Sequence, residues 1–151
     1  MITGVRIALD VGSVRIGVAK CDKDGLLATP VATVASGPDA LFEIVNLVQE
    51  HSAVCVYVGK PISLAGKDTA STALAINFAT ELAKLLNDFD LPVRLIDERL
   101  STVSAQRGMH EAGRNVKQSR DAIDQAAAVV ILEHALDSER HAGDFVGEEV
   151  S

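Results

Sequence analysis

The chain has 151 residues, enough for about one domain with a single buried core, and its formal net charge is −7 at pH 7. Apolar residues make up 48% of the chain and aromatic residues only 3%, so an aliphatic core is expected. The first residues lack the layout of a signal peptide and no apolar run approaches the ~18 residues of a membrane span, which predicts a cytoplasmic protein without a membrane partner.

The first third of the chain predicts three strands joined by short turns. Apolar runs cover residues 5–10, 14–21 and 26–35, and the sequence "DKDG" at residues 22–25 is a turn signal. Connections this short join antiparallel neighbours, so the three strands are expected to form an antiparallel unit.

The middle of the chain predicts alternating helices and strands. A helix is expected to begin near Pro38 and to end near His51. Residues 53–59 form a continuous apolar run typical of a buried parallel strand, and residues 92–97 predict a fifth strand. The long helix between these strands is expected to pack through an apolar stripe of Leu74, Phe78, Leu82, Leu85 and Phe89.

Two helices are expected to complete the domain. One begins at Ser101 or Thr102, either of which suits an N-cap, and ends at Gly113. The other covers residues 119–138. The acidic segment 139–151 that follows is expected to be a disordered tail.

The order of these elements predicts an α/β fold with one domain over residues 1–138. Three antiparallel strands followed by two parallel strands form a five-stranded mixed sheet, with helices on both faces. Ligands of such open sheets bind beyond the carboxyl ends of the strands. Asp10 ends the first strand, and Asp97 and Glu98 end the fifth, so one edge receives carboxylates from both. Because adjacent strand residues face opposite sides, we expect only one of Asp97 and Glu98 to be a ligand.

The stretch "DVGSVRIG" at residues 10–17 has two interpretations when taken alone. In the first, it is a tight turn in which Gly12 supplies a backbone angle that other residues resist. In the second, Asp10 is a metal ligand beside a phosphate-binding turn. The other carboxylates of the chain must decide between them.

Asp124 favours the second interpretation. It shares one helix face with Ala127, Ala128 and Ile131, which would let the helix lie close to the sheet. An ionised acid in that contact is costly unless it is paired or bound to a metal, whereas Asp121 suits the charge preference of a helix N-terminus. Acids from three elements at one edge suit a hard divalent cation better than zinc.

Positive charge is concentrated in one part of the chain. Residues 99–120 carry a net charge of +4, between segments with net charges of −4 and −7. A solvated surface is one explanation, and a phosphate-binding surface is the other. The basic residues are Arg99, Arg107, Arg114, Lys117 and Arg120.

The two cysteines, Cys21 and Cys55, lie in apolar runs without metal-ligand spacing. Buried reduced thiols are expected, with a disulfide as the alternative.

Four motifs stand at the predicted strand ends and on the last helix. They are "ALDVGSVRIGVA" at residues 8–19, "VGKP" at 58–61, "DERLST" at 97–102 and "DAIDQAAAVVIL" at 121–132. In this order and spacing they resemble the YqgF/RuvX family of ribonuclease H-like proteins, described as Holliday junction resolvases and as pre-16S rRNA processing nucleases. The resemblance covers nearly the whole chain, from about Val5 to about Leu136.

The resemblance implies a ribonuclease H-like fold and a nuclease whose catalytic, metal-binding carboxylates are Asp10, Glu98 and Asp124. Asp121, which is not a usual family acid, is a candidate supplementary ligand. Two Mg²⁺ or Mn²⁺ ions would generate the nucleophile and stabilise the leaving group of a phosphodiester. Lys60 replaces the usual family leucine. The candidate substrate-binding residues are Arg15, Lys60, Arg99, Thr102, Arg114 and Lys117.

The expected function is metal-dependent hydrolysis of phosphodiester bonds in structured nucleic acid, in ribosomal RNA precursor processing, by a monomer or weak homodimer. The alternative is a homodimeric Holliday junction resolvase, because a four-way DNA junction has two strands to cut. An actin-like or sugar-kinase ATPase is disfavoured, since 151 residues leave no room for its second domain. A catalytically silent nucleic-acid-binding protein is a further rival, which a nuclease assay would distinguish.

Overall fold

The computed structural model describes residues 3–61, 69–98 and 116–150, and within the last segment it describes side chains from Ala122 onward. The elements, in chain order, are β1 (Val5–Val11), β2 (Arg15–Cys21), β3 (Ala28–Ala35), α1 (Ala40–Glu50), β4 (Ala53–Lys60), α2 (Ala70–Leu86), the short 3-10 helix η1 (Asn87–Phe89), β5 (Val93–Asp97), α4 (Val116–Ala142) and β6 (Glu148–Val150).

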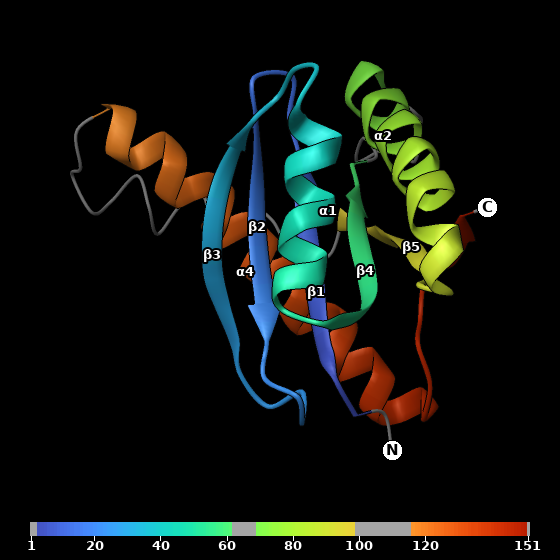
Figure 1. Ribbon diagram of the computed structural model, residues 1–151. Helices are drawn as coiled ribbons and strands as arrows, with labels where there is room; N and C mark the ends of the chain where they lie inside the picture. Colours follow the sequence, from blue (N-terminus) through green and yellow to red (C-terminus); the bar gives the residue numbers. More distant parts are fainter. Residues whose placement is uncertain (1–2, 62–68, 99–115, 151) are drawn as a thin grey trace.

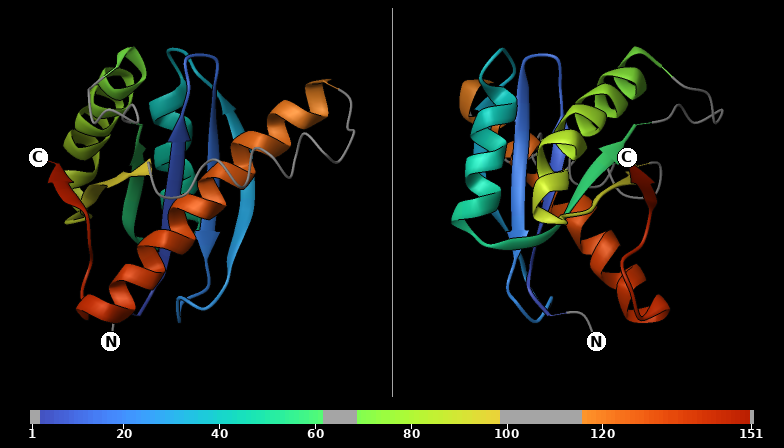
Figure 2. Two further views of the ribbon diagram at one scale, coloured as in Figure 1. Left: turned by 180° about the vertical axis from the view of Figure 1, so that it is seen from behind. Right: turned by 45° about the vertical axis from the view of Figure 1, so that its right-hand side comes forward.

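One mixed sheet forms the centre of the molecule, with the strand order β3-β2-β1-β4-β5-β6. β1, β2 and β3 pair antiparallel, while β1, β4 and β5 pair parallel. α1 and α2 cover one face, and α4 crosses the other face obliquely (Figure 1, Figure 2). The predicted mixed sheet with helices on both faces is confirmed, but the predicted count of five strands is wrong. The sixth strand, β6, pairs antiparallel with β5.

The two faces of the sheet differ because strand residues alternate between them. On β1, Ile7, Leu9 and Val11 pack into the aliphatic core beneath α1 and α2. The intervening residues face α4, where Ala8 packs against the small residues of that helix. Arg6 and Asp10 therefore lie on the α4 face, at opposite ends of β1.

α2 packs through a different stripe from the one that the sequence predicted. Of the predicted residues, Leu82 is buried and Phe78 is partly buried, whereas Leu74, Leu85 and Phe89 are exposed. The buried face consists of Thr72, Ala75, Ala79, Leu82, Ala83 and Leu86. The alanines allow close approach to the sheet, which turns the bulkier Leu74 and Leu85 outward.

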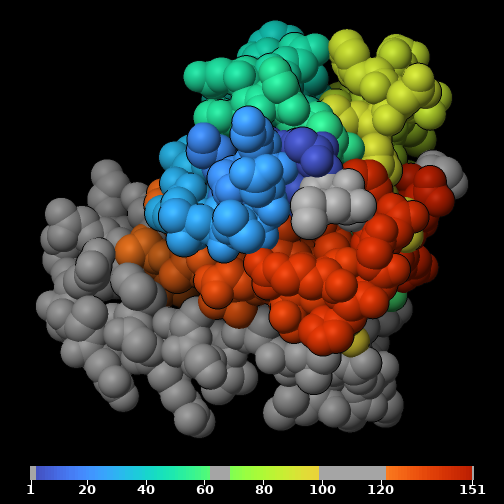
Figure 3. All heavy atoms as spheres, turned by 90° about the horizontal axis from the view of Figure 1, so that it is seen from below, coloured from blue at the N-terminus to red at the C-terminus, as the bar shows by residue number. Residues whose placement is uncertain are grey.

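The fold continues beyond the predicted end at residue 138. α4 runs to Ala142, the side chain of Glu139 is buried, and Phe145 and Val146 pack against the core on the α4 face. Figure 3 shows this end of the molecule, with the red C-terminal part of α4 beneath the blue hairpin between β2 and β3. The helix predicted over residues 101–113 lies outside the described residues. Although α4 has 27 residues, no described helix is long and apolar enough to cross a bilayer.

Cys21 and Cys55 are buried free thiols, as expected. Cys21 lies on β2 and Cys55 on β4, with β1 between these two strands. Strands that are not neighbours lie about 10 Å apart, beyond the reach of a disulfide, so this structure does not contain the alternative bridge.

Candidate active site

Asp10 and Glu98 meet at the carboxyl edge of the sheet. Asp10 lies on β1, Glu98 directly follows β5, and β4 separates the two strands. Their carboxyl groups share a hydrogen bond. Between them on β4 stands Gly59, where a Cβ atom would collide with the Glu98 carboxyl and with Ile131 of α4. Gly59 therefore provides the space in which the two acids meet.

The burial of this pair of acids favours a retained proton. Burial raises the pKa of Glu98 to about 8, and the charge of Asp10, the hydrogen bond to Asp10 and the charge of Asp97 act in the same direction. Burial also raises the pKa of Asp10 to about 6, with a further contribution from the charge of Asp124, although the hydrogen bond with Glu98 opposes the rise. A divalent cation at this position would replace the retained proton.

Of the two adjacent acids at the end of β5, Glu98 is therefore the one that joins Asp10. Its side chain is buried, at 6% exposure, whereas the preceding Asp97 is partly exposed. Because β5 ends at Asp97, burial rather than strand alternation distinguishes the two acids.

Asp124 reaches the same edge from α4. The helix approaches β2 at Gly17, where a Cβ atom would collide with the backbone carbonyl of Asp124. Gly17 is the direct partner of Asp10 in the antiparallel register, so the close approach places Asp124 near Asp10. A hydrogen bond of 2.9 Å from Gln125 Nε2 to Thr33 Oγ1 ties the next residue of the helix to β3. The predicted helix face of Asp124 with Ala127, Ala128 and Ile131 is confirmed by the burial of those three residues.

The Asp124 carboxylate is paired with Arg15. Nε of Arg15 donates to Oδ2 of Asp124 over 3.0 Å, and the two side chains are 30% and 24% exposed. Within the described segments, no three His, Cys, Asp or Glu side chains converge as a ready group of metal ligands. Asp10 and Glu98 thus form a close pair, while Asp124 stands beside them in an ion pair with a strand arginine.

The donor chemistry of this edge fits a hard divalent cation. All three acids offer carboxylate oxygens, and two of them are already in contact. The third acid, Asp124, acts on Asp10 through its charge and pairs with Arg15.

The remaining predicted residues are distributed as follows. Lys60 ends β4, and its Nζ lies 3.4 Å from Oε2 of Glu148 on β6. Lys117 and Asp121 belong to the first turns of α4, but their side chains lie outside the described part of the chain. Arg99, Thr102, Arg107 and Arg114 also lie outside the described residues, and the side chain of Arg120 does so as well.

Two glycines have roles that the sequence did not reveal. Gly59 makes room for Glu98, and only its place in the "VGKP" motif marked it. Gly12 does not adopt a left-handed conformation, so the unusual backbone angle considered for it is not found. Its amide donates to the Arg15 carbonyl over 2.9 Å, and that carbonyl occupies the space that a Cβ atom would need.

Comparison with other proteins places this architecture in a known group. The sequence profile of the RuvX family, described as Holliday junction resolvase, matches residues 4–138. A relative named "Putative pre-16S rRNA nuclease" from Leifsonia xyli is 50% identical over 142 residues, which cover 93% of this chain and 90% of the relative. A protein of the same name from Streptomyces avermitilis is 47% identical, with coverage of 97% and 94%.

Solved structures share the fold at much lower sequence identity. Thermus thermophilus RuvC in complex with a Holliday junction substrate superposes with a TM-score of 0.55 at 13% identity, covering 91% of this chain and 96% of RuvC. The fowlpox virus Holliday junction resolvase gives a TM-score of 0.50 at 11% identity, with coverage of 91% and 99%. These neighbours confirm the ribonuclease H-like fold. With the profile match and the close relatives, they show that the chain belongs to the RuvX family.

Proposed function

We propose that this protein is a metal-dependent endonuclease that hydrolyses phosphodiester bonds in structured nucleic acid, and that it processes a ribosomal RNA precursor in the cytoplasm. The observation that carries the proposal is the buried contact between the Asp10 and Glu98 carboxyls at the carboxyl edge of the sheet. The names of the close relatives support a nuclease and suggest the precursor as substrate.

The proposed catalytic carboxylates are Asp10, Glu98 and Asp124, with Asp121 as a supplementary ligand. Nucleases of this fold generally use divalent metal ions, and we propose two ions, Mg²⁺ or Mn²⁺. Such ions activate water and neutralise the charge that develops on an attacked phosphate and its leaving oxygen. The protein's part is to hold the carboxylates together in a buried place and to release the proton shared by Asp10 and Glu98.

The substrate brings negative charge to an edge that is itself rich in acids. Cationic and polar side chains must therefore hold the phosphates, and such contacts carry little sequence information. In the described part of the chain, Arg15 is well placed for this contact, because it pairs with Asp124 at this edge. The other proposed substrate contacts are Lys60, Arg99, Thr102, Arg114 and Lys117.

Resolution of Holliday junctions in recombination is the second candidate, favoured by the description of the family. It requires two active sites related by a two-fold axis. The oligomeric state therefore distinguishes the two functions, and we propose a monomer or weak homodimer. Exposed apolar residues on the α1 and α2 side, Phe42, Leu85 and Phe89, are the surface to examine if the measured mass is that of a dimer.

The test is cleavage by the Asp10→Asn variant of a ribosomal RNA precursor fragment and of a four-way DNA junction, in Mg²⁺ or Mn²⁺. The substitution keeps the side-chain volume but removes the ligand charge, so cleavage should be lost while nucleic-acid binding remains. Asp137→Asn is a matched control, since Asp137 is an exposed residue near the far end of α4. Cleavage by the Asp10→Asn variant at the rate of the control would contradict the assignment. Symmetric paired nicks in the junction by a stable dimer would favour the second function.

A further inference from the structure

The ion pair between Arg15 and Asp124 occupies a carboxylate that the proposed function also assigns to a metal ion. If Asp124 is a metal ligand, its carboxylate must face a divalent cation. In the structure one of its oxygens, Oδ2, accepts a hydrogen bond from the Arg15 guanidinium at 3.0 Å. A guanidinium and a metal ion are both cations, so they compete for the same carboxylate charge.

The position of the pair makes an exchange feasible. Arg15 is the first residue of β2, next to the β1–β2 turn, and its side chain is 30% exposed. A pair at this exposure is weakly held, because water competes for both partners. The backbone on both sides is fixed, since α4 contacts β2 at Gly17 and Gln125 bonds to Thr33. The side chains can therefore change partners without movement of the helix.

The same arginine has a second anionic partner available in the proposed reaction. A phosphodiester that approaches Asp10 and Glu98 arrives at the edge where β2 begins. Guanidinium groups bind phosphate oxygens with two parallel hydrogen bonds, a geometry that they also use for carboxylates. Arg15 can thus exchange its hydrogen bond to the Asp124 carboxylate for hydrogen bonds to a phosphate.

We propose that Arg15 is the counter-ion of Asp124 and competes with the divalent metal for that carboxylate, and that metal binding releases Arg15 to hold a substrate phosphate. This inference rests on the proposed function, because it takes Asp124 as a metal ligand. It makes metal and nucleic acid bind with positive coupling. Each ligand favours the arrangement in which Arg15 has left Asp124.

The first measurement is Mn²⁺ affinity without nucleic acid, by calorimetry at about 0.15 M salt. Removal of the competing cation in Arg15→Gln should tighten Mn²⁺ binding about two- to five-fold, the range expected when a partly exposed ion pair is lost. Arg15→Lys, which keeps the charge, should lie between this variant and the wild type. Arg140→Gln is the matched control: it removes the same charge near the far end of α4, where screening should leave Mn²⁺ affinity within about 1.5-fold of the wild type.

The second measurement is the effect of metal on nucleic-acid affinity. A labelled four-way junction is titrated in EDTA and in Ca²⁺, under conditions in which a gel shows the junction intact. Divalent metal should strengthen binding more in the wild-type protein than in Arg15→Gln. The difference should have the same direction as the gain in metal affinity of Arg15→Gln and should not exceed a gain of that order, because coupling is reciprocal.

These results separate the inference from the function on which it rests. Mn²⁺ binding by folded Arg15→Gln that is equal to or weaker than that of the control overturns the competition. An unchanged effect of metal on junction binding overturns the release of Arg15 to phosphate. Asp10→Asn is measured in parallel, and if that variant binds Mn²⁺ as the wild type does, the proposed metal site itself fails, whatever the Arg15 variants show.

Discussion

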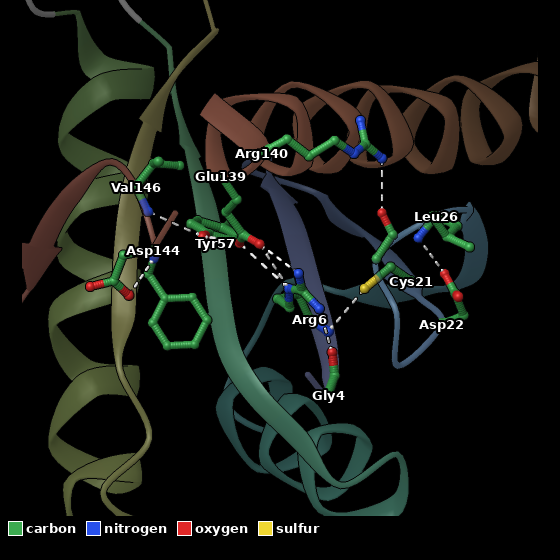
Figure 4. A network of polar contacts seen from close by, with 12 residues as sticks. Gly4, Arg6, Cys21, Asp22, Leu26, Tyr57, Glu139, Arg140, Asp144 and Val146 are labelled. Carbon is green, nitrogen blue, oxygen red and sulfur yellow. Dashed lines mark hydrogen bonds and ion pairs between the residues drawn. The ribbon is translucent and has the colours of Figure 1, made fainter. Parts of the chain in front are cut away.

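Replacement of Arg6 by methionine should destabilise the protein strongly, although Arg6 lies far from the proposed active site. Figure 4 shows Arg6 of β1 pointing toward Glu139 of α4, with Tyr57 of β4 on the other side of the carboxylate. The Arg6 guanidinium lies 2.6 Å from Oε1 of Glu139, and both side chains are only 4% exposed. The Tyr57 hydroxyl donates to Oε2 of the same carboxylate.

The size of the effect follows from this burial. Arg6→Met leaves the Glu139 charge with Tyr57 as a donor but without its cation, in a place with little exposure to water. Breaking one side of a buried ion pair in this way typically costs ~3–5 kcal/mol. For a domain of this size each kcal/mol corresponds to ~2–4 °C, so the melting temperature should fall by ~6–20 °C.

The assay is chemical and thermal denaturation of Arg6→Met beside Arg140→Met. Arg140 lies next to Glu139 on α4, but its side chain is 53% exposed and its nearest carboxylate oxygen is 3.9 Å away. Its loss removes this weak pair and a 2.9 Å hydrogen bond to the Gly25 carbonyl, and should cost only ~1 kcal/mol. The double variant Arg6→Met with Glu139→Leu removes both charges and should be more stable than Arg6→Met alone. A cost below ~1 kcal/mol for Arg6→Met, or no recovery in the double variant, would refute this account of the pair.

Three further predictions concern pH, packing and the C-terminus. The folded-state pKa values of Asp10 and Glu98, about 6 and about 8, lie above the ordinary values of these side chains. The stability that the protonated pair contributes is therefore full below about pH 4, and it is lost as the pH rises through 6 and 8. Denaturation midpoints in EDTA should therefore fall from pH 5 to pH 9, and less so in Glu98→Gln. Gly17→Ala should cost ~1–3 kcal/mol and weaken Mn²⁺ binding in calorimetry, because the added Cβ pushes α4 from β2 at Asp124. Truncation after Ala142 removes β6 and two packed apolar residues, so the melting temperature should drop by more than ~5 °C.

The main features of the fold and of the candidate site were accessible from the sequence because their signals are local. Apolar runs marked the first five strands, and the position of Asp10 and Glu98 at strand ends placed both at one edge. The alanines beside Asp124 showed that this acid faces the sheet. The YqgF/RuvX motifs then connected these separate residues, since no local pattern shows that strands far apart in sequence are neighbours.

The C-terminal part of the fold was missed because its stabilising contacts are not local. Glu139 looks like a polar residue at a helix end, and its partner Arg6 lies 133 positions earlier in the chain. β6 is short and acidic, and only its pairing with β5 makes it a strand. One signal was available. Arg6 alternates with Ala8 and Asp10 on one face of a buried strand, and a buried arginine on such a face requires an acid opposite it.

The same chemical pair, a strand arginine with an α4 carboxylate, occurs at both ends of the sheet with different consequences. Fifteen residues, or ~22 Å of helix, separate Asp124 from Glu139. At the far end the side chains are only 4% exposed, so solvent competes little for the pair and Glu139 holds α4 on the sheet. At the proposed active-site edge the side chains are 30% and 24% exposed, so the Arg15 pair is expected to open more readily. In the proposed mechanism, a helix held firmly at one end would present Asp124 at a constant place while its carboxylate exchanges Arg15 for a metal ion.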